Sequence, residues 1–236
     1  TSLNYWYFHI DKTPGTSNQI GSFTNLHGII LRQGIIRKID DKQRLQIFLT
    51  PRLINDMRGF GIENWQLGGH VLYDKTINDK LSLGYGILYN GEFFGPFLLP
   101  VVNLNAQVSK KLTIKGLLPV NLNVKYQVSD KFAVGFNHFG IATSFRLNDS
   151  DDIGDYVERQ SINLSVFSEY ELFNNVYADA RIGKMLNFSY KQFASEQKVD
   201  LAIPLATFGD NRISENIPFN GGVFLELKLI YRMNIK

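Results

Sequence analysis

A period of two in the placement of apolar residues constrains this chain more than any other feature of its sequence. It is clearest in residues 112–128, where apolar side chains stand at even positions with polar ones between them. The even set is Leu112, Ile114, Leu118, Val120, Leu122, Val124, Tyr126 and Val128, and the interleaved set is Thr113, Lys115, Asn121, Asn123, Lys125 and Gln127. This period predicts extended backbone whose two faces meet different media.

The same alternation returns near the end of the chain, in residues 222–235. The apolar row is Val223, Leu225, Leu227, Leu229, Tyr231, Met233 and Ile235, and it alternates with Phe224, Glu226, Lys228, Ile230, Arg232 and Asn234. Because Glu226, Lys228 and Arg232 stand opposite an unbroken apolar row, we expect the charged face to be wet.

About twelve segments of this kind are separated by polar turns, and together they are typical of a transmembrane antiparallel β-barrel. The expected strands are residues 3–10, 26–37, 44–53, 64–73, 81–89, 97–108, 112–118, 120–128, 132–147, 161–172, a segment from 176, and 222–235. The break at Leu118-Pro119 is expected because proline cannot donate to a strand ladder. A phase slip near His138-Phe139-Gly140 predicts a bulge. Residues 191–220 are expected to form either a further strand or a loop over the mouth, so ten or fourteen strands also fit.

The lengths of the connections between strands predict that the two rims of the barrel differ. Short turns at 38–42, 74–80, 109–111, 129–131 and 173–175 alternate with longer connections at 11–22, 90–96, 148–155 and 191–220. This asymmetry is typical of outer-membrane barrels, and an even strand number places both termini on one side.

Alternation alone also fits a soluble barrel or sandwich with its apolar row inside. Strand number favours the membrane alternative, because a closed barrel of about twelve strands is too wide for one inward layer of apolar side chains to fill. The charged candidates for the lumen are Lys115, Lys125, Glu169, Glu171, Asp179, Arg181, Glu226, Lys228 and Arg232. Aromatic residues near expected strand ends, as in the interfacial girdles of membrane barrels, are Tyr73, Tyr89, Phe97, Phe132, Tyr170 and Tyr231.

Composition excludes several classes of function. The 236 residues contain no cysteine and carry a net charge of +3 without a basic block, so neither thiol chemistry nor nucleic-acid binding is expected. No run of 18 apolar residues encodes a transmembrane helix. One domain over residues 1–236 is expected, located in the cell outer membrane after export by a signal peptide that lies outside this numbering.

No catalytic, metal or cofactor site is expected. The four histidines, His9, His27, His70 and His138, lie on separate expected strands without the spacing of zinc ligands. No serine–histidine–acid set stands out, so the chain is not expected to be an enzyme. An acidic loop at 148–155 departs from the calcium-loop pattern at Ile153 and Gln160, so a solvated outer loop is its expected role.

Residues 81–147 resemble an uncharacterised family of outer-membrane β-barrel proteins found in Bacteroidota. The features that carry the resemblance are Gly95-Pro96, Pro100, Leu118-Pro119, Tyr126 and the turn Ser129-Asp130-Lys131. The resemblance implies an outer-membrane location and transfers no catalytic residues. The chain ends on Ile235-Lys236, whereas many such barrels end on an aromatic residue.

Two functions follow from the charged candidates. Spread around an open pore, they predict a small-solute channel with a narrow charged lumen. Packed into a paired network, they predict an accessory barrel that does not conduct and belongs to a larger outer-membrane protein complex. The expected partners are outer-membrane lipid and other outer-membrane proteins.

Overall fold

The computed structural model describes residues 1–10, 25–149, 153–204, 206–215 and 221–232. The strands are β1 (Ser2–His9), β2 (Asn25–Lys38), β3 (Gln43–Asn55), β4 (Trp65–Asn78), β5 (Leu81–Glu92), β6 (Gly95–Gln107), β7 (Leu112–Leu118), β8 (Asn121–Gln127), β9 (Phe132–Arg146), β10 (Tyr156–Phe173), β11 (Val176–Phe193), β12 (Leu201–Ile203), β13 (Ala206–Phe208) and β14 (Val223–Tyr231). In the described ranges the helical structure is one 3-10 turn, Ile62–Asn64, and no helix there has the length and apolarity of a membrane span.

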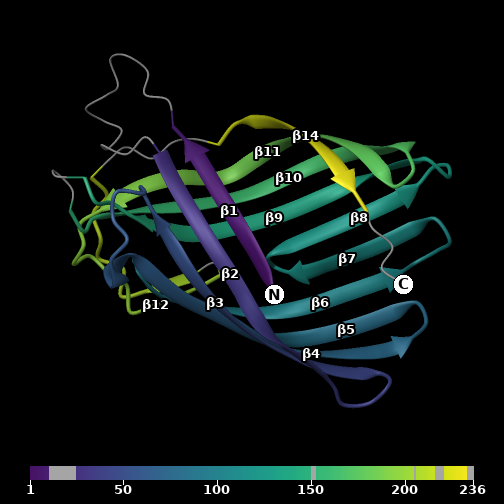
Figure 1. Ribbon diagram of the computed structural model, residues 1–236, viewed down its shortest axis with the longest axis horizontal. Coiled ribbons are helices and arrows are strands. Elements are labelled where there is room, and N and C mark those ends of the chain that lie inside the picture. The colour runs from purple at the N-terminus through teal and green to yellow at the C-terminus, as the bar shows by residue number, and fades with distance from the viewer. Residues whose placement is uncertain (11–24, 150–152, 205, 216–220, 233–236) are drawn as a thin grey trace.

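These strands form one 14-stranded sheet, so the prediction of an all-β, antiparallel protein is confirmed. The main path runs from β1 through β11 in chain order and then to β14, with each strand antiparallel to its neighbour. Among the described residues β1 pairs with β2 and β14 pairs with β11, so the two ends of the path are not paired to each other. Figure 1 shows the sheet curling so that β1 and β2 cross in front of β9 to β11.

Most of the sheet shows the predicted alternation between an outer apolar face and an inner face. On β4, Trp65 and Leu67 are exposed, whereas Gln66 and Asp74 of the opposite face are buried. On β14, Leu225, Leu227 and Leu229 are each 72–74% exposed. The apolar rows of neighbouring strands meet in register and form two outer apolar lines: Ile35–Ile47–Val71–Ile87 across β2 to β5, and Phe136–Val166–Ile182–Leu225 across β9, β10, β11 and β14.

The alternation ends at one end of the sheet, which we call the closed end. Here consecutive residues are all buried, in residues 52–55 of β3, 143–145 of β9 and 156–159 of β10. Burial of consecutive residues means that both faces of a strand are covered. Asn55 of β3 also pairs in parallel with Arg146 of β9, which joins strands far apart along the main path.

Three apolar clusters occupy the interior. The first joins Leu26, Ile30 and Ile54 of β2 and β3 to Phe145 and Val157 of β9 and β10. The second packs the β5–β6 turn against the C-terminal part of β11 and β12, through Phe94, Tyr156, Phe193, Val199 and Ala202. The third consists of Leu72, Leu99 and Val101. The sequence predicted a polar interior, but β1 to β3 pack face to face on β9 to β11, and this contact supplies an apolar filling.

The local predictions had mixed outcomes. Residues 112–118 and 121–127 are separate strands, as the Leu118-Pro119 break predicted. The bulge expected near His138 was wrong: β9 pairs continuously with β10, and the register shift lies between Gln160 and Ile162 on the β10–β11 side. The longer connection expected at 90–96 is instead a tight turn at residues 93–94, because the ladder continues through Gly91–Pro96 and Glu92–Gly95.

The uncertain segment 191–220 contains the short hairpin β12–β13, and Ala202 of β12 pairs in parallel with Phe97 of β6. Both alternatives for this segment therefore hold in part, since it contains strands and also packs against the closed end. Several expectations fall outside the described residues, namely those for the loop 11–22, the centre of the acidic loop at 150–152 and the terminal Ile235-Lys236.

Candidate functional site: paired charges inside the sheet

The first group of charges is centred on Glu169 of β10, which is buried. Its Oε1 atom accepts hydrogen bonds from Lys125 Nζ of β8 at 2.5 Å and from Arg232 Nη1 at 3.0 Å, and its Oε2 atom accepts a second bond from Arg232. The Arg232 guanidinium lies 4.1 Å from the centroid of the Tyr177 ring. One carboxylate thus joins residues from three separated parts of the chain.

The second group lies beside it, on β11 and β14. Asp179 is buried and accepts hydrogen bonds from Arg181 at 2.6 and 3.2 Å. Arg181 also lies 3.6 Å from Glu226, which in turn pairs with Lys228 Nζ at 2.9 Å. The register explains these contacts, because Asp179 is opposite Lys228 and Arg181 is opposite Glu226. We call these two groups together the wall network.

The wall network brings together seven of the nine charged candidates. The two others lie apart: Lys115 is exposed on β7, and the carboxylate of Glu171 accepts a hydrogen bond from the backbone N–H of Asn175. The sequence did not single out Phe167 or Tyr177, whose rings lie against Arg181 and Arg232.

The aromatic candidates divide by face. Tyr89, Tyr170 and Tyr231 are exposed, and Tyr73 and Phe132 are partly exposed. Phe97 differs from these five, because it points to the inner face of β6 and packs against the second and third apolar clusters. Phe97 is therefore not part of the outer aromatic set.

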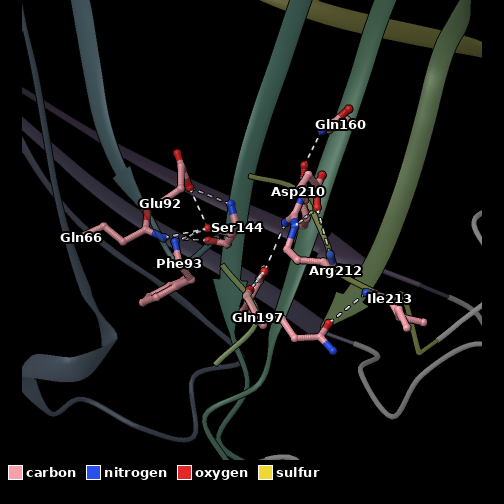
Figure 2. Close-up of polar contacts among 11 residues, drawn as sticks. Gln66, Glu92, Phe93, Ser144, Gln160, Gln197, Asp210, Arg212 and Ile213 are labelled. Carbon is pink, nitrogen blue, oxygen red and sulfur yellow. Dashed lines mark hydrogen bonds and ion pairs between the residues drawn. The ribbon is translucent and has the colours of Figure 1, made fainter. Parts of the chain in front are cut away.

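A further ion pair lies at the closed end. Arg52 Nη2 of β3 is 3.0 Å from Glu92 Oε1 of β5, and both side chains are at most 5% exposed. The other oxygen of Glu92 accepts hydrogen bonds from the backbone N–H and the hydroxyl of Ser144, each at 2.8 Å, and Gln66 Nε2 donates to the same hydroxyl at 3.1 Å (Figure 2).

The sequence interpretation missed this pair, although a signal was present. Ser82, Gly84, Gly86 and Asn90 form the small and polar face of β5, and extending that alternation by one step reaches Glu92.

A third group holds the segment after β13 against the closed end. The Arg212 guanidinium pairs with Asp210 at 2.8 Å (Figure 2) and with Glu158 of β10 at 2.7 Å. It also lies 4.4 Å from the centroid of the Phe193 ring. Hydrogen bonds from Arg212 lower the pKa of the Asp210 carboxyl below its ordinary value. No periodicity marks Arg212 or Asp210 in the sequence, because they belong to an irregular segment.

The described residues hold no group of three or more His, Cys, Asp or Glu side chains that could bind a metal ion. His70 stacks on Phe48, and His138 Nε2 donates to the carbonyl of Pro119 at 2.8 Å. These sites share one feature: each contains an interior carboxylate that is paired with a guanidinium or ammonium group. Removing one partner of a buried pair leaves the other charge uncompensated, which is costly.

The fold and these sites define an all-β protein whose sheet is apolar on its outer face and carries paired charges inside. Residues 2–199 match the family model of a domain of unknown function, DUF6268, and the chain belongs to this family. The matched residues include β1 to β11 and end before β12. Neither the search of curated proteins nor the search of solved structures gave a match.

Proposed function

We propose that this chain is an integral outer-membrane β-barrel protein that does not conduct in the state described, and that it acts as an accessory barrel. Its outer face contacts lipid or another membrane protein. Its interior is held shut by the closed end and by the wall network.

The two outer apolar lines are the observation that carries the membrane part of the proposal. In the second line, Leu225, Ile182 and Val166 are 72%, 55% and 57% exposed and stand directly opposite one another on successive strands. In the first, Ile35, Val71 and Ile87 are 63%, 48% and 51% exposed. Soluble monomers rarely expose contiguous apolar patches of this kind, whereas membrane barrels carry such a band around the wall.

The packing of the closed end supports the absence of conduction. Apolar clusters join β2 and β3 to β9, β10 and β11 and join the β5–β6 turn to β10 and β12, and the buried Arg52–Glu92 pair links β3 to β5. A channel needs unpaired charges or polar groups along a water-filled path. In this chain, the charges of the wall network and of the Arg52–Glu92 pair are bound to one another. The packing therefore favours the accessory alternative over the small-solute channel.

Reconstitution tests both parts of the proposal. Purified protein mixed with preformed liposomes and floated on a density gradient is expected to rise with the lipid and to resist extraction by alkaline carbonate. Protein that stays in the aqueous fraction refutes membrane insertion.

Planar-bilayer recording then tests conduction, with an unrelated open porin as the positive control. No steady current above the lipid baseline is expected. Steady ohmic current in proportion to the inserted protein refutes the proposal of a closed interior and supports the small-solute channel. Co-purification from solubilised membranes with a fixed, larger protein partner supports the accessory role, and isolation as a lone chain in mild detergent opposes it.

A further inference from the structure

A cavity of about 440 Å³ lies near the closed end and takes no part in the wall network or the proposed function. Its walls come from β6, β9, β10 and the hairpin β12–β13, together with Pro119 and Val120 of the β7–β8 turn, Asn187 of β11 and Arg212. Phe97, Leu99, Ala142, Ile162, Ala202 and Ile203 line it. Gln160, Asn187 and Thr207, which also line it, are exposed and mark the side on which the cavity opens.

We propose that this cavity binds an uncharged, largely apolar ligand, of the class of long-chain alcohols. The proposal does not depend on membrane insertion. It rests on the chemistry of the wall and on the pairing of the charges in it.

The apolar wall sets the body of the ligand. Most lining side chains are aliphatic or aromatic, which is typical of small-molecule sites that bury an apolar body and orient it by a few polar groups. An apolar cavity of about 150 Å³ accommodates benzene, so this one has room for a ligand on the order of 15 non-hydrogen atoms.

The charges in the wall are already paired, which excludes a charged head group. Arg212 binds Glu158 and Asp210, and the second oxygen of Glu158 accepts a hydrogen bond from Gln160. A carboxylate or ammonium ligand therefore meets no free counter-charge in the wall and pays the cost of leaving water.

Fluorescence displacement tests the proposal on full-length protein in amphipol, free of detergent. The probe is N-phenyl-1-naphthylamine, an uncharged aromatic amine that brightens on leaving water. We expect saturable binding, displaced by dodecanol. Dodecanoate and dodecylammonium, which share the chain and differ in charge, are expected to displace it at least about tenfold less well, since a buried unpaired charge is costly.

Matched glycine variants locate the site. A Cβ atom at Gly140 meets only the carbonyl oxygens of Pro119 and Val120, at 3.6 and 3.8 Å, so Gly140→Leu fits the backbone and fills the cavity. It is expected to abolish displaceable binding. Gly222→Leu is the control, because a Cβ atom there has no neighbour within 4 Å among the described residues and Gly222 is not in the wall.

Circular dichroism of each variant checks that the sheet is retained. Equal displacement by all three dodecyl compounds, or unchanged binding in a folded Gly140→Leu protein, overturns the proposal.

Discussion

The wall network and the closed end contain the same kinds of ion pair in different surroundings. At the wall, Arg232 is 42% exposed and the Glu169 it binds is 6% exposed. At the closed end, Arg52 and Glu92 are 5% and 0% exposed. The strands that carry the wall network have one face covered and the other exposed to the surrounding medium. The strands of the closed end are covered on both faces.

This difference determines what each pair contributes. A pair whose cation reaches solvent is screened and worth little, but a fully buried pair becomes expensive as soon as one partner is removed. The closed end is therefore expected to dominate the stability of the interior, while the proposed role of the outer apolar lines is to contact lipid.

Removing one partner of the closed-end pair is expected to have the largest effect. Arg52→Met leaves the Glu92 carboxylate buried without its cation, which costs about 3–5 kcal/mol in the free energy of unfolding. Urea unfolding followed by tryptophan fluorescence measures it. The double variant with Glu92→Gln, which keeps an acceptor for Ser144, is expected to recover more than half of the loss. A single-variant loss below about 1 kcal/mol contradicts the burial of this pair.

A charge on the exposed apolar face of β14 is expected to have the next largest effect. Leu227→Arg, at the middle of β14, costs about 2–4 kcal/mol in a bilayer. Ile39→Arg is the control, because Ile39 is exposed in the β2–β3 turn, outside the strands. Unfolding from liposomes is the measurement, and equal small losses for both variants argue that β14 faces water.

A smaller effect is expected at the wall network. Glu169→Gln removes the charge that binds Lys125 and Arg232 and costs about 1–2 kcal/mol, reduced by added salt. Glu171→Gln on the same strand changes stability by less than about 0.5 kcal/mol, because its recorded contact is one backbone N–H. Equal effects at the two positions show that the network is not a unit.

The smallest effect is expected from acid at the Arg212 contact. Because the pKa of Asp210 is lowered in the folded protein, its contribution is present above its unfolded pKa of about 3.9 and is lost as the pH falls through the folded value. Asp210→Asn is therefore expected to lower Tm slightly at pH 6, and its difference from the wild type is expected to shrink as the pH falls below the unfolded pKa. A Tm difference that persists at low pH contradicts this assignment.

The sequence predicts the wall far better than the closed end. Alternation on β14 and β11 places Glu226 and Arg181 on one face and Leu225 and Ile182 on the other, because a strand with one buried face records its environment in every second residue. In residues 156–159, where both faces are buried, Tyr, Val, Glu and Arg follow one another without a period.

The long-range packing could not be predicted from the sequence, for a related reason. The parallel contact of Asn55 with Arg146 and the docking of Arg212 on Glu158 join segments more than fifty residues apart. Nothing in the local pattern of either segment specifies its partner. The same holds for the cavity, whose walls come from several parts of the chain that are far apart in sequence.

Neighbouring positions on β14 offer a direct probe of which face meets lipid. With Trp6 and Trp65 replaced by Phe, single tryptophans are introduced as Leu227→Trp and Lys228→Trp, and each protein is reconstituted with lipids brominated along the acyl chain. We expect strong quenching of the tryptophan at position 227 and little at 228. Equal bromine quenching at the two positions, or stronger quenching of 227 by aqueous acrylamide, refutes a lipid-facing outer surface.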